Sequence, residues 1–283
     1  MADSKPIDAA EASPHQDSVS RRSFFKQASI AGGSVLALSG LLSLASAQDS
    51  EENQTSTNAG ITSGDQKILI AAEIAEALAV TTYTHIITQA PFFGNLPKDD
   101  QGYLRAARQE EMSHYLLEES VTNEPSPFTS FFYPHHMFAD AQTTLNVLVT
   151  LEDAFIAAYL VGVRRLSSDD FKVTAARIMG IESDHRTLAR VLAGDVSTVD
   201  GGPIHRITGI QGISEPADPP NNNGYERTLC WNRISQAVEA LTPFVDKAAA
   251  QAAGFDTTRS FKFCPFTPHL PSKLGDFVSF SGC

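Results

Sequence analysis

The sequence contains little cysteine and little positive charge, and both shortages exclude classes of protein. Only 3 of the 283 residues are cysteine, and no two of them are spaced as CxxC. A disulfide scaffold and a CxxC-type zinc or thioredoxin-like site are therefore excluded. Lys and Arg number 21 against 33 Asp and Glu, which gives a formal net charge of −12. Because nucleic-acid phosphates are neutralised by clustered Lys and Arg, this composition argues against a nucleic-acid partner.

Two catalytic patterns are also missing, since no Ser–His–Asp order and no Gly-rich phosphate loop stands out. Hydrophobic residues make up 42% and charged residues 19% of the chain, which is typical of a globular protein with a packed core. The cysteines Cys230, Cys264 and Cys283 allow three alternative pairings, and one disulfide is expected if the protein is exported.

The first 47 residues differ from the rest of the chain. The segment SRRSFFK at Ser20–Lys26 precedes a weakly apolar stretch of 17 residues at 28–44, and Ala45-Ser46-Ala47 follows. This order resembles a twin-arginine export signal, with Phe25 where leucine is most common. The stretch is too short and too rich in Gly and Ser to span a membrane stably.

The resemblance implies the twin-arginine export machinery as a partner, a mature chain that starts near Gln48 without a stable membrane span, and a periplasmic or extracellular location. Substrates of this route cross the membrane folded, often because a cofactor is loaded first. Residues 48–64 are mostly polar and are predicted to form a flexible linker.

Four long helical segments predict an α-helical bundle at 65–194. Apolar periodicity and caps place the helices at 63–89, 99–120, 140–166 and 168–194. The segment Ser63-Gly64-Asp65-Gln66 fits a capping box at the first helix start. None of the four contains an internal proline, and helices this long need partner helices to bury their apolar faces.

The loop lengths predict how the four helices are connected. Short loops make the first and second helices, and the third and fourth, antiparallel pairs. The 19 residues at 121–139 reach roughly 60 Å when extended, more than the ~35 Å length of a 23-residue helix. The expected fold is therefore all-α, a four-helix bundle with a long crossover between the second and third helices.

Residues 195–283 are predicted to form a C-terminal extension. A loop rich in Gly, Pro and Asn at 195–227 precedes a fifth amphipathic helix at 228–253. Six phenylalanines follow between Phe255 and Phe280. We expect them in an irregular tail that packs over the bundle.

Two ExxH motifs are the strongest chemical signal. Glu111 and His114 lie in the second helix, and Glu182 and His185 lie in the fourth. Residues three apart share a helix face, so each motif presents a carboxylate and an imidazole to one point. One ExxH is weak evidence, because most such pairs are solvated, but two at matching places in the bundle indicate a shared site.

The other two helices each place a carboxylate within an apolar stripe. Glu76 and Glu152 are followed seven residues later by Tyr83 and Tyr159. An unpaired buried carboxylate costs several kcal/mol, which a metal ion or a hydrogen-bonded proton offsets. Since the order Glu, Tyr, ExxH occurs twice, the two helix pairs look like repeats arranged about one mid-bundle site.

At these residues the sequence resembles the ferritin-like superfamily, whose di-iron or di-manganese members use a Glu from each of two helices and an ExxH from each of the others. The E-x6-Y spacing is similar to that of rubrerythrin-like members. The segments AEALAVTTY and ESDHRTLARVLAG look like exported desiccation-related ferritin-like proteins. The resemblance covers about residues 65–194.

The resemblance implies a cofactor of two Fe or Mn ions. The implied ligands, which would also be the catalytic residues, are Glu76, Glu111, His114, Glu152, Glu182 and His185. Glu111 and Glu182 would bridge the ions, and one His and one further Glu would complete each site. Tyr83 and Tyr159 would hydrogen-bond the ligand carboxylates. A ligand set without thiolate favours iron or manganese.

Several further residues are assigned minor roles. Glu73, one turn before Glu76, is a candidate spare ligand, with a solvated position as the alternative, and Glu110, Glu118 and Glu119 are expected on solvated faces. His85, His135 and His136 are expected to be ordinary loop or helix-end histidines, and Arg186 and Arg190 either neutralise carboxylates near the site or solvate the fourth helix.

The sequence favours an exported di-metal redox protein that reacts with O2 or H2O2, through Fe(II) oxidation, peroxide removal or a catalase-like reaction. One alternative is a non-catalytic stress or desiccation-related binding protein in which the metal only stabilises the bundle. Iron storage in a cage is a third. Whether the protein is a di-iron or di-manganese oxidoreductase, and whether it forms a homo-oligomer, is left open by the sequence.

Overall fold

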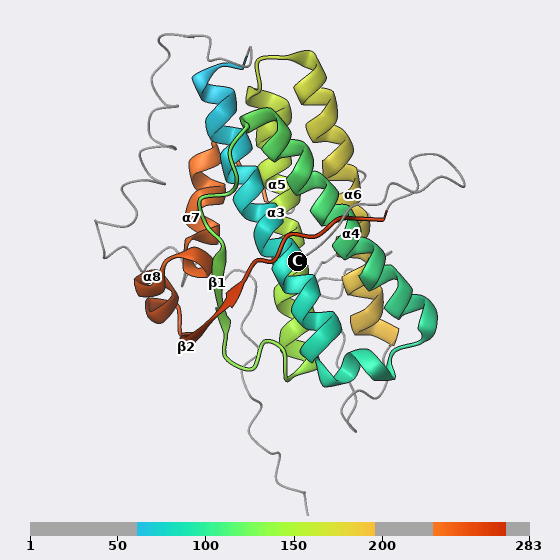
Figure 1. The fold of residues 1–283 in the computed structure, drawn as a ribbon. Coiled ribbons are helices and arrows are strands. Elements are labelled where there is room, and N and C mark those ends of the chain that lie inside the picture. Colours follow the sequence, from blue (N-terminus) through green and yellow to red (C-terminus); the bar gives the residue numbers. More distant parts are fainter. Residues whose placement is uncertain (1–60, 196–228, 270–283) are drawn as a thin grey trace, which may run out of the picture.

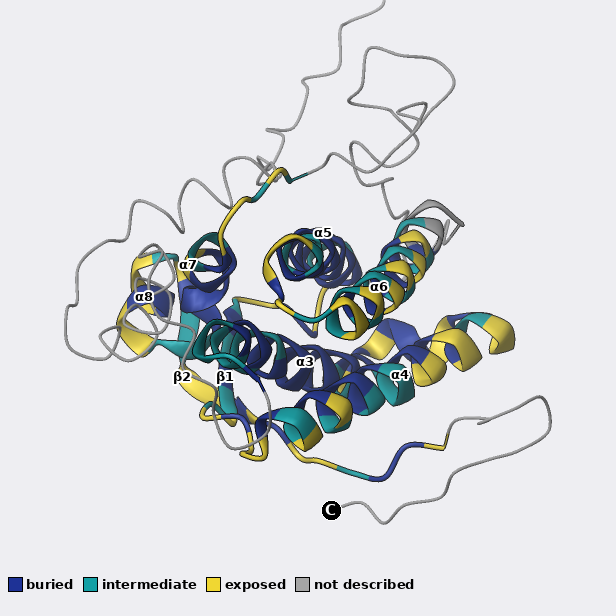
Figure 2. Cartoon of the chain, turned by 90° about the horizontal axis from the view of Figure 1, so that it is seen from above, coloured by how far each residue is buried: buried dark blue, intermediate teal, exposed yellow. Residues whose placement is uncertain are grey.

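The computed structural model describes residues 61–195 and 229–269, and four long helices dominate the first range (Figure 1). They are α3 (Ser63–Gln89), α4 (Lys98–Thr122), α5 (Ala141–Arg165) and α6 (Asp169–Asp195). α3 packs along α4, and α5 packs along α6, as Figure 2 shows from above. The predicted all-α four-helix bundle is thereby confirmed. The predicted export signal at 1–47 lies outside the described residues.

The cap of α3 lies one residue earlier than predicted. Thr62, not Ser63, is the N-cap residue: its hydroxyl accepts from the backbone N–H of Asp65, and the Asp65 carboxylate accepts from the backbone N–H of Thr62. Asp65 also accepts from the backbone and the hydroxyl of Ser167, between α5 and α6. One carboxylate thus caps α3 and joins it to the other helix pair.

The connection from α4 to α5 returns along the bundle beside α3 (Figure 1). It contains strand β1 (Ser130–Pro134), and the Tyr133 hydroxyl lies 3.0 Å from the hydroxyl of Thr82 on α3. The shorter connection from α3 to α4 contains the 3₁₀ helix η1 (Pro91–Asn95). The sequence therefore predicted the long crossover but not its strand.

The predicted fifth helix at 228–253 is wrong in its bounds and continuity. α7 (Ile234–Val245) begins later, and α8 (Lys247–Ala252) is separated from it at Asp246. Pro243 lies inside α7 and has no N–H to donate, which weakens the helix near its end. Asp246 then caps α8 by accepting from the backbone N–H of Ala249.

The predicted irregular tail is partly a strand. β2 (Phe255–Lys262) pairs antiparallel with β1, from Ser130 opposite Lys262 to Pro134 opposite Phe255. Beyond it the chain crosses α4, where Phe263 contacts Tyr115 and the Arg108 guanidinium lies 4.3 Å from the Phe266 ring centre. Burial alternates along β1, where Phe131 and Tyr133 are buried, and β2 buries Phe255 and Phe261 near its two ends, so the pair covers aromatic side chains from both strands. Cys264, in this stretch, is disulfide-bonded.

The core is divided unequally along the bundle. A large apolar cluster joins all four helices, α7 and the two strands, whereas a small one lies where α5 ends and α6 begins. α5 is long and apolar enough to cross a membrane by length and composition alone, and 78% of its most apolar window is buried inside the protein. A buried core helix of a globular protein shows this property, just as a membrane-spanning helix does.

Replacing Asp65 tests the link between the helix pairs. We expect Asp65→Ala to lower the free energy of unfolding by about 2 to 4 kcal/mol, because one cap and the bonds to Ser167 are lost. Asp170→Ala, at an exposed first-turn position of α6, should cost less than about 1 kcal/mol. Urea unfolding measures both, and equal losses would contradict the assignment.

The same variant makes a prediction about pH. Burial acts to raise the pKa of Asp65, but the hydrogen bonds from Ser167 and Thr62 hold it below its ordinary value. A lowered folded-state pKa contributes stability that is present above the unfolded value and is lost as the pH falls through the folded one. The difference between wild type and Asp65→Ala should therefore shrink below about pH 4.

Candidate metal centre

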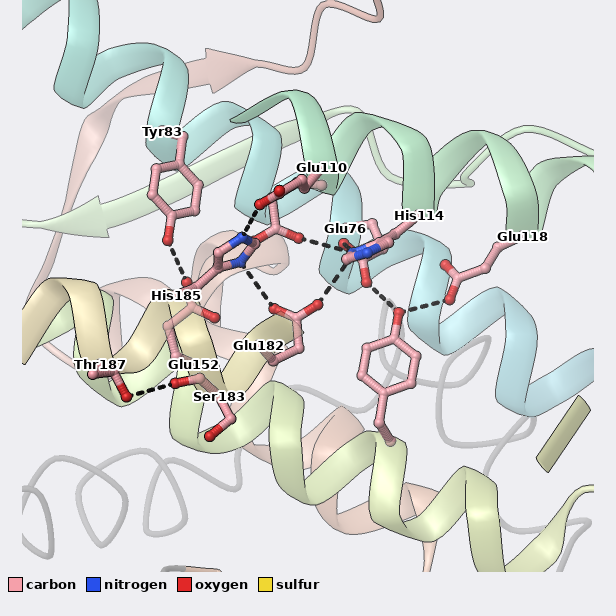
Figure 3. Close-up of polar contacts among 12 residues, drawn as sticks. Glu76, Tyr83, Glu110, His114, Glu118, Glu152, Glu182, Ser183, His185 and Thr187 are labelled. Atoms are coloured by element: carbon pink, nitrogen blue, oxygen red, sulfur yellow. Dashed lines mark hydrogen bonds and ion pairs between the residues drawn. The ribbon is translucent and has the colours of Figure 1, made fainter. Parts of the chain in front are cut away.

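All four long helices place acidic or histidine side chains at one level of the bundle. α3 supplies Glu76 and α5 supplies Glu152, each in the middle of an apolar helix face. α4 and α6 supply the two ExxH motifs. All of these side chains are buried, with the four carboxylates at most 1% exposed. The sequence-predicted set is thus brought together by the structure: Glu76, Glu111, His114, Glu152, Glu182 and His185 (Figure 3).

The atoms fall into two groups that share two residues. Glu76, Glu111, His114 and Glu182 form one group of potential ligands, and Glu111, Glu152, Glu182 and His185 form the other. Within each group the four ligand atoms lie within 4.8 Å of one another. Glu111 and Glu182 belong to both groups, which is the position of bridging carboxylates.

Both imidazoles turn the Nδ1 atom toward the shared carboxylates. His114 Nδ1 lies 3.2 Å from Glu182 Oε1 and 3.5 Å from Glu111 Oε2. His185 Nδ1 lies 2.9 Å from Glu111 Oε1 and 3.5 Å from Glu182 Oε2. Each shared carboxylate therefore directs one oxygen toward each histidine.

The inward-facing atoms of the six residues are buried and make no hydrogen bond outside the set in the described structure; several of them contact one another only through the ion pairs given above. They are Oε2 of Glu76 and Glu152, both carboxylate oxygens of Glu111 and Glu182, and Nδ1 of His114 and His185. Buried polar atoms are rarely left unpartnered, because desolvation without a bond costs free energy. This donor set of oxygens and imidazole nitrogens suits a pair of divalent cations.

Without a cation, it is unfavourable for all four carboxylates of the site to be ionised. Burial raises the pKa of Glu76 and Glu152 well above its ordinary value, and the neighbouring carboxylates raise it further. Burial acts to lower the pKa of His114 and His185, but the surrounding carboxylates raise it well above its ordinary value. Without metal, burial and repulsion therefore favour the protonated forms of Glu76 and Glu152, and the nearby carboxylates favour protonated histidines.

Two tyrosines connect the halves of the site crosswise. The Tyr83 hydroxyl on α3 donates to Oε1 of Glu152 on α5, at 2.7 Å. The Tyr159 hydroxyl on α5 hydrogen-bonds Oε1 of Glu76 on α3. In both carboxylates the other oxygen, Oε2, remains for the centre. The tyrosines thus orient the carboxylates without occupying the inward-facing atoms.

Glu110 was expected on a solvated face; it is partly exposed, but it also contacts His185, which was not predicted. Its side chain is 36% exposed, and its Oε2 lies 2.8 Å from Nε2 of His185 (Figure 3). A carboxylate on Nε2 holds the proton there and leaves Nδ1 as the acceptor that faces the site. The signal in the sequence was that Glu110 directly precedes Glu111. This position places it at the edge of the helix face that carries the ligand.

Glu118 was also expected to be solvated, but it is only 3% exposed. Its Oε1 lies 2.8 Å from the Tyr159 hydroxyl, one residue away from the ligand set. Glu73, the predicted spare ligand, is buried and accepts from the Thr122 hydroxyl, and it is in neither ligand group. The i, i+4 spacing from His114 to Glu118 could have indicated that Glu118 faces inward.

The remaining polar residues lie apart from the ligand groups. His85 packs against Phe138 and Phe261, as an ordinary core-edge histidine does. His135 and His136 lie in the crossover. Arg186 is buried and forms an ion pair at 3.0 Å with Asp153, the residue next to Glu152, so it neutralises a carboxylate near the site and does not solvate α6.

Fold and site together define a class: four-helix bundles with a carboxylate and histidine cluster between two antiparallel helix pairs. Residues 64–195 match the family model of the ferritin-like domain. This part of the chain belongs to the ferritin-like superfamily. No curated protein and no solved structure matches the chain.

Metal binding should release protons. Ligands bind metal as carboxylates and neutral imidazoles, whereas the raised pKa values of Glu76, Glu152, His114 and His185 keep protons on the metal-free site. The apparent affinity for Mn(II) should therefore rise with pH between about 6 and 8. Calorimetry in buffers of different ionisation enthalpy counts the protons, and binding without proton release would contradict this electrostatic assignment.

The position of Glu110 predicts an effect on only one half of the centre. Glu110→Gln should lower metal affinity by roughly 10 to 100-fold, because the carboxylate no longer fixes the proton on His185 Nε2. Glu119→Gln is the matched control, since Glu119 lies on the same helix and is in neither ligand group. The same loss in both variants would show a general electrostatic effect instead.

Proposed function

We propose that the ferritin-like domain binds two iron or manganese ions and uses them for redox chemistry with O2 or H2O2. The observation that carries this proposal is the pair of four-residue groups that share Glu111 and Glu182. Their inward-facing atoms are buried and make no hydrogen bond outside the set in the described structure. Four carboxylates and two divalent ions give a neutral cluster, which a buried site can accommodate.

Each ion would be held by both halves of the bundle. Glu76 and His114 would complete one site, and Glu152 and His185 the other, with Glu111 and Glu182 shared between them. When bound and reduced, such a pair supplies electrons to O2 or peroxide. Oxygen and imidazole ligands without thiolate favour iron or manganese for this role.

The protein itself would control water and protons around the ions. The helix packing buries every ligand, so bulk water is largely excluded and electrostatic interactions are strengthened. The Tyr83 hydroxyl oxygen lies 2.7 Å from Glu152 Oε1 and donates to it, and Glu110 Oε2 lies 2.8 Å from His185 Nε2, where it would accept the ring proton. These contacts fix the ligand orientations before any substrate arrives.

The place of action belongs to the same proposal. The N-terminal segment that resembles a twin-arginine signal supports export to the periplasm or beyond. A route that carries folded proteins suits a buried centre, because the bundle must close around its ions. Ferrous ion, O2 and H2O2 are the substrates that this centre suits, in oxidative-stress chemistry.

Metal stoichiometry and anaerobic reactivity test the proposal. Protein loaded with Fe(II) or Mn(II) should bind about two ions per chain, and the reduced protein should consume O2 or H2O2 on mixing. The double variant Glu111→Ala/Glu182→Ala should lose both ions, because both sites share these residues. Glu119→Ala/Glu239→Ala removes the same charge outside the ligand groups and should keep them.

Binding of fewer than one ion per chain would contradict the proposal. Two tightly bound ions with no turnover of O2, H2O2 or Fe(II) would leave the metal site but exclude the redox function. If removal of the metal then also collapsed the stability of the bundle, the non-catalytic stress-protein alternative would be favoured.

A further inference from the structure

A cavity of about 130 Å³ lies at the end of the bundle where α3 and α6 begin and α4 and α5 end. α7 closes one side of it. Many of its lining side chains are small, among them Ala72, Ala75, Ala158, Gly162 and Ala175. The cavity exists because these residues are too short to fill the space between the helix pairs.

The wall of this cavity is apolar except at three residues, Glu118, Tyr159 and Thr174. Thr174 is on α6 and already donates to the backbone carbonyl of Asp170. Glu118 differs, because it is only 3% exposed and its Oε2 has no hydrogen-bond partner in the described structure. The apolar wall of the cavity thus includes one acidic residue, Glu118, whose Oε2 is buried and makes no hydrogen bond in the described structure.

The direction of the neighbouring hydrogen bonds follows from counting protons. The Tyr159 hydroxyl contacts both Glu76 Oε1 and Glu118 Oε1. A phenol has one proton and can donate to one of them only. If Glu76 is an ionised ligand, it accepts from Tyr159, and the Glu118 carboxyl must carry a proton and donate to Tyr159. Glu118 Oε2 is then an acceptor.

The other half of the bundle lacks the cavity acid. The two ExxH motifs are 71 residues apart in the sequence, and the same offset places Ala189 opposite Glu118. Ala189 is fully buried in the large apolar cluster. Two symmetric metal sites require neither Glu118 nor a cavity, so these two features indicate a function separate from metal binding.

We propose that this cavity binds a small, largely apolar molecule with one hydroxyl group, which donates its proton to Glu118 Oε2. Cavities of roughly 150 Å³ with apolar walls hold a molecule of the size of benzene. Simple phenols and small cyclic alcohols match this volume and polarity. The bound hydroxyl is joined to Glu76 through Glu118 and Tyr159, which couples the cavity to the proposed centre without direct contact.

Phenol and benzene are suitable probes because they differ only in the hydroxyl group. Titrated into the full chain and followed by calorimetry and ligand-observed NMR, phenol should bind saturably at one site per chain. Benzene should bind roughly tenfold more weakly, since Oε2 stays unsatisfied. Because binding is measured with and without metal, it can succeed even if the redox proposal fails.

Variants separate the cavity from its polar anchor. Ala158→Phe should reduce phenol binding at least tenfold by filling the cavity, whereas Ala106→Phe, at an exposed position on α4, should not. Ala72→Leu fills the cavity from α3 if Ala158→Phe does not fold. Glu118→Leu should remove the preference for phenol over benzene.

Three results would overturn the proposal. The first is no saturable binding by the wild type, whether water or another segment of the chain fills the cavity. The second is unchanged binding in a folded cavity-filling variant. The third is equal affinity of the wild type for phenol and benzene, which would remove the assigned role of Glu118.

Discussion

The stability of the bundle depends on how it accommodates four buried carboxylates that lie close to one another. Glu76, Glu111, Glu152 and Glu182 come from four different helices and are at most 1% exposed. Burial and mutual repulsion cost several kcal/mol per ion unless opposite charge is supplied. The crossed tyrosine bonds, the two histidines and the apolar helix faces all serve an arrangement that two divalent ions would neutralise.

The two helix pairs are near-equivalent around the centre, and their differences lie just outside it. Glu110 touches His185, while the corresponding position beside His114 is Ile181. Glu118 likewise has Ala189 as its counterpart. The symmetric residues suit the two metal positions, and the asymmetric ones orient a single histidine and shape a cavity on one side. A few substitutions in a bundle of two similar helix pairs can therefore make the two halves of its central site different.

Much of the bundle could be predicted from the sequence, because long apolar periodicities and i, i+3 motifs are local signals. Helix ends and segment pairing depend on distant partners, so the strand pair β1–β2 and the break between α7 and α8 were missed. Glu118 was mistaken for a solvated acid, and the contact of Glu110 with His185 was missed, for the same reason. Their roles depend on His185 and Tyr159, which belong to the other helix pair.

Anomalous diffraction from crystals of the protein loaded with Mn(II) tests the central claim most directly. The account predicts two manganese peaks between the helix pairs, each contacted by one histidine Nδ1 and by both Glu111 and Glu182. A single peak, or peaks only at surface carboxylates while the six residues pair with one another, would contradict it. In that case the buried carboxylates would be stabilised by protons alone.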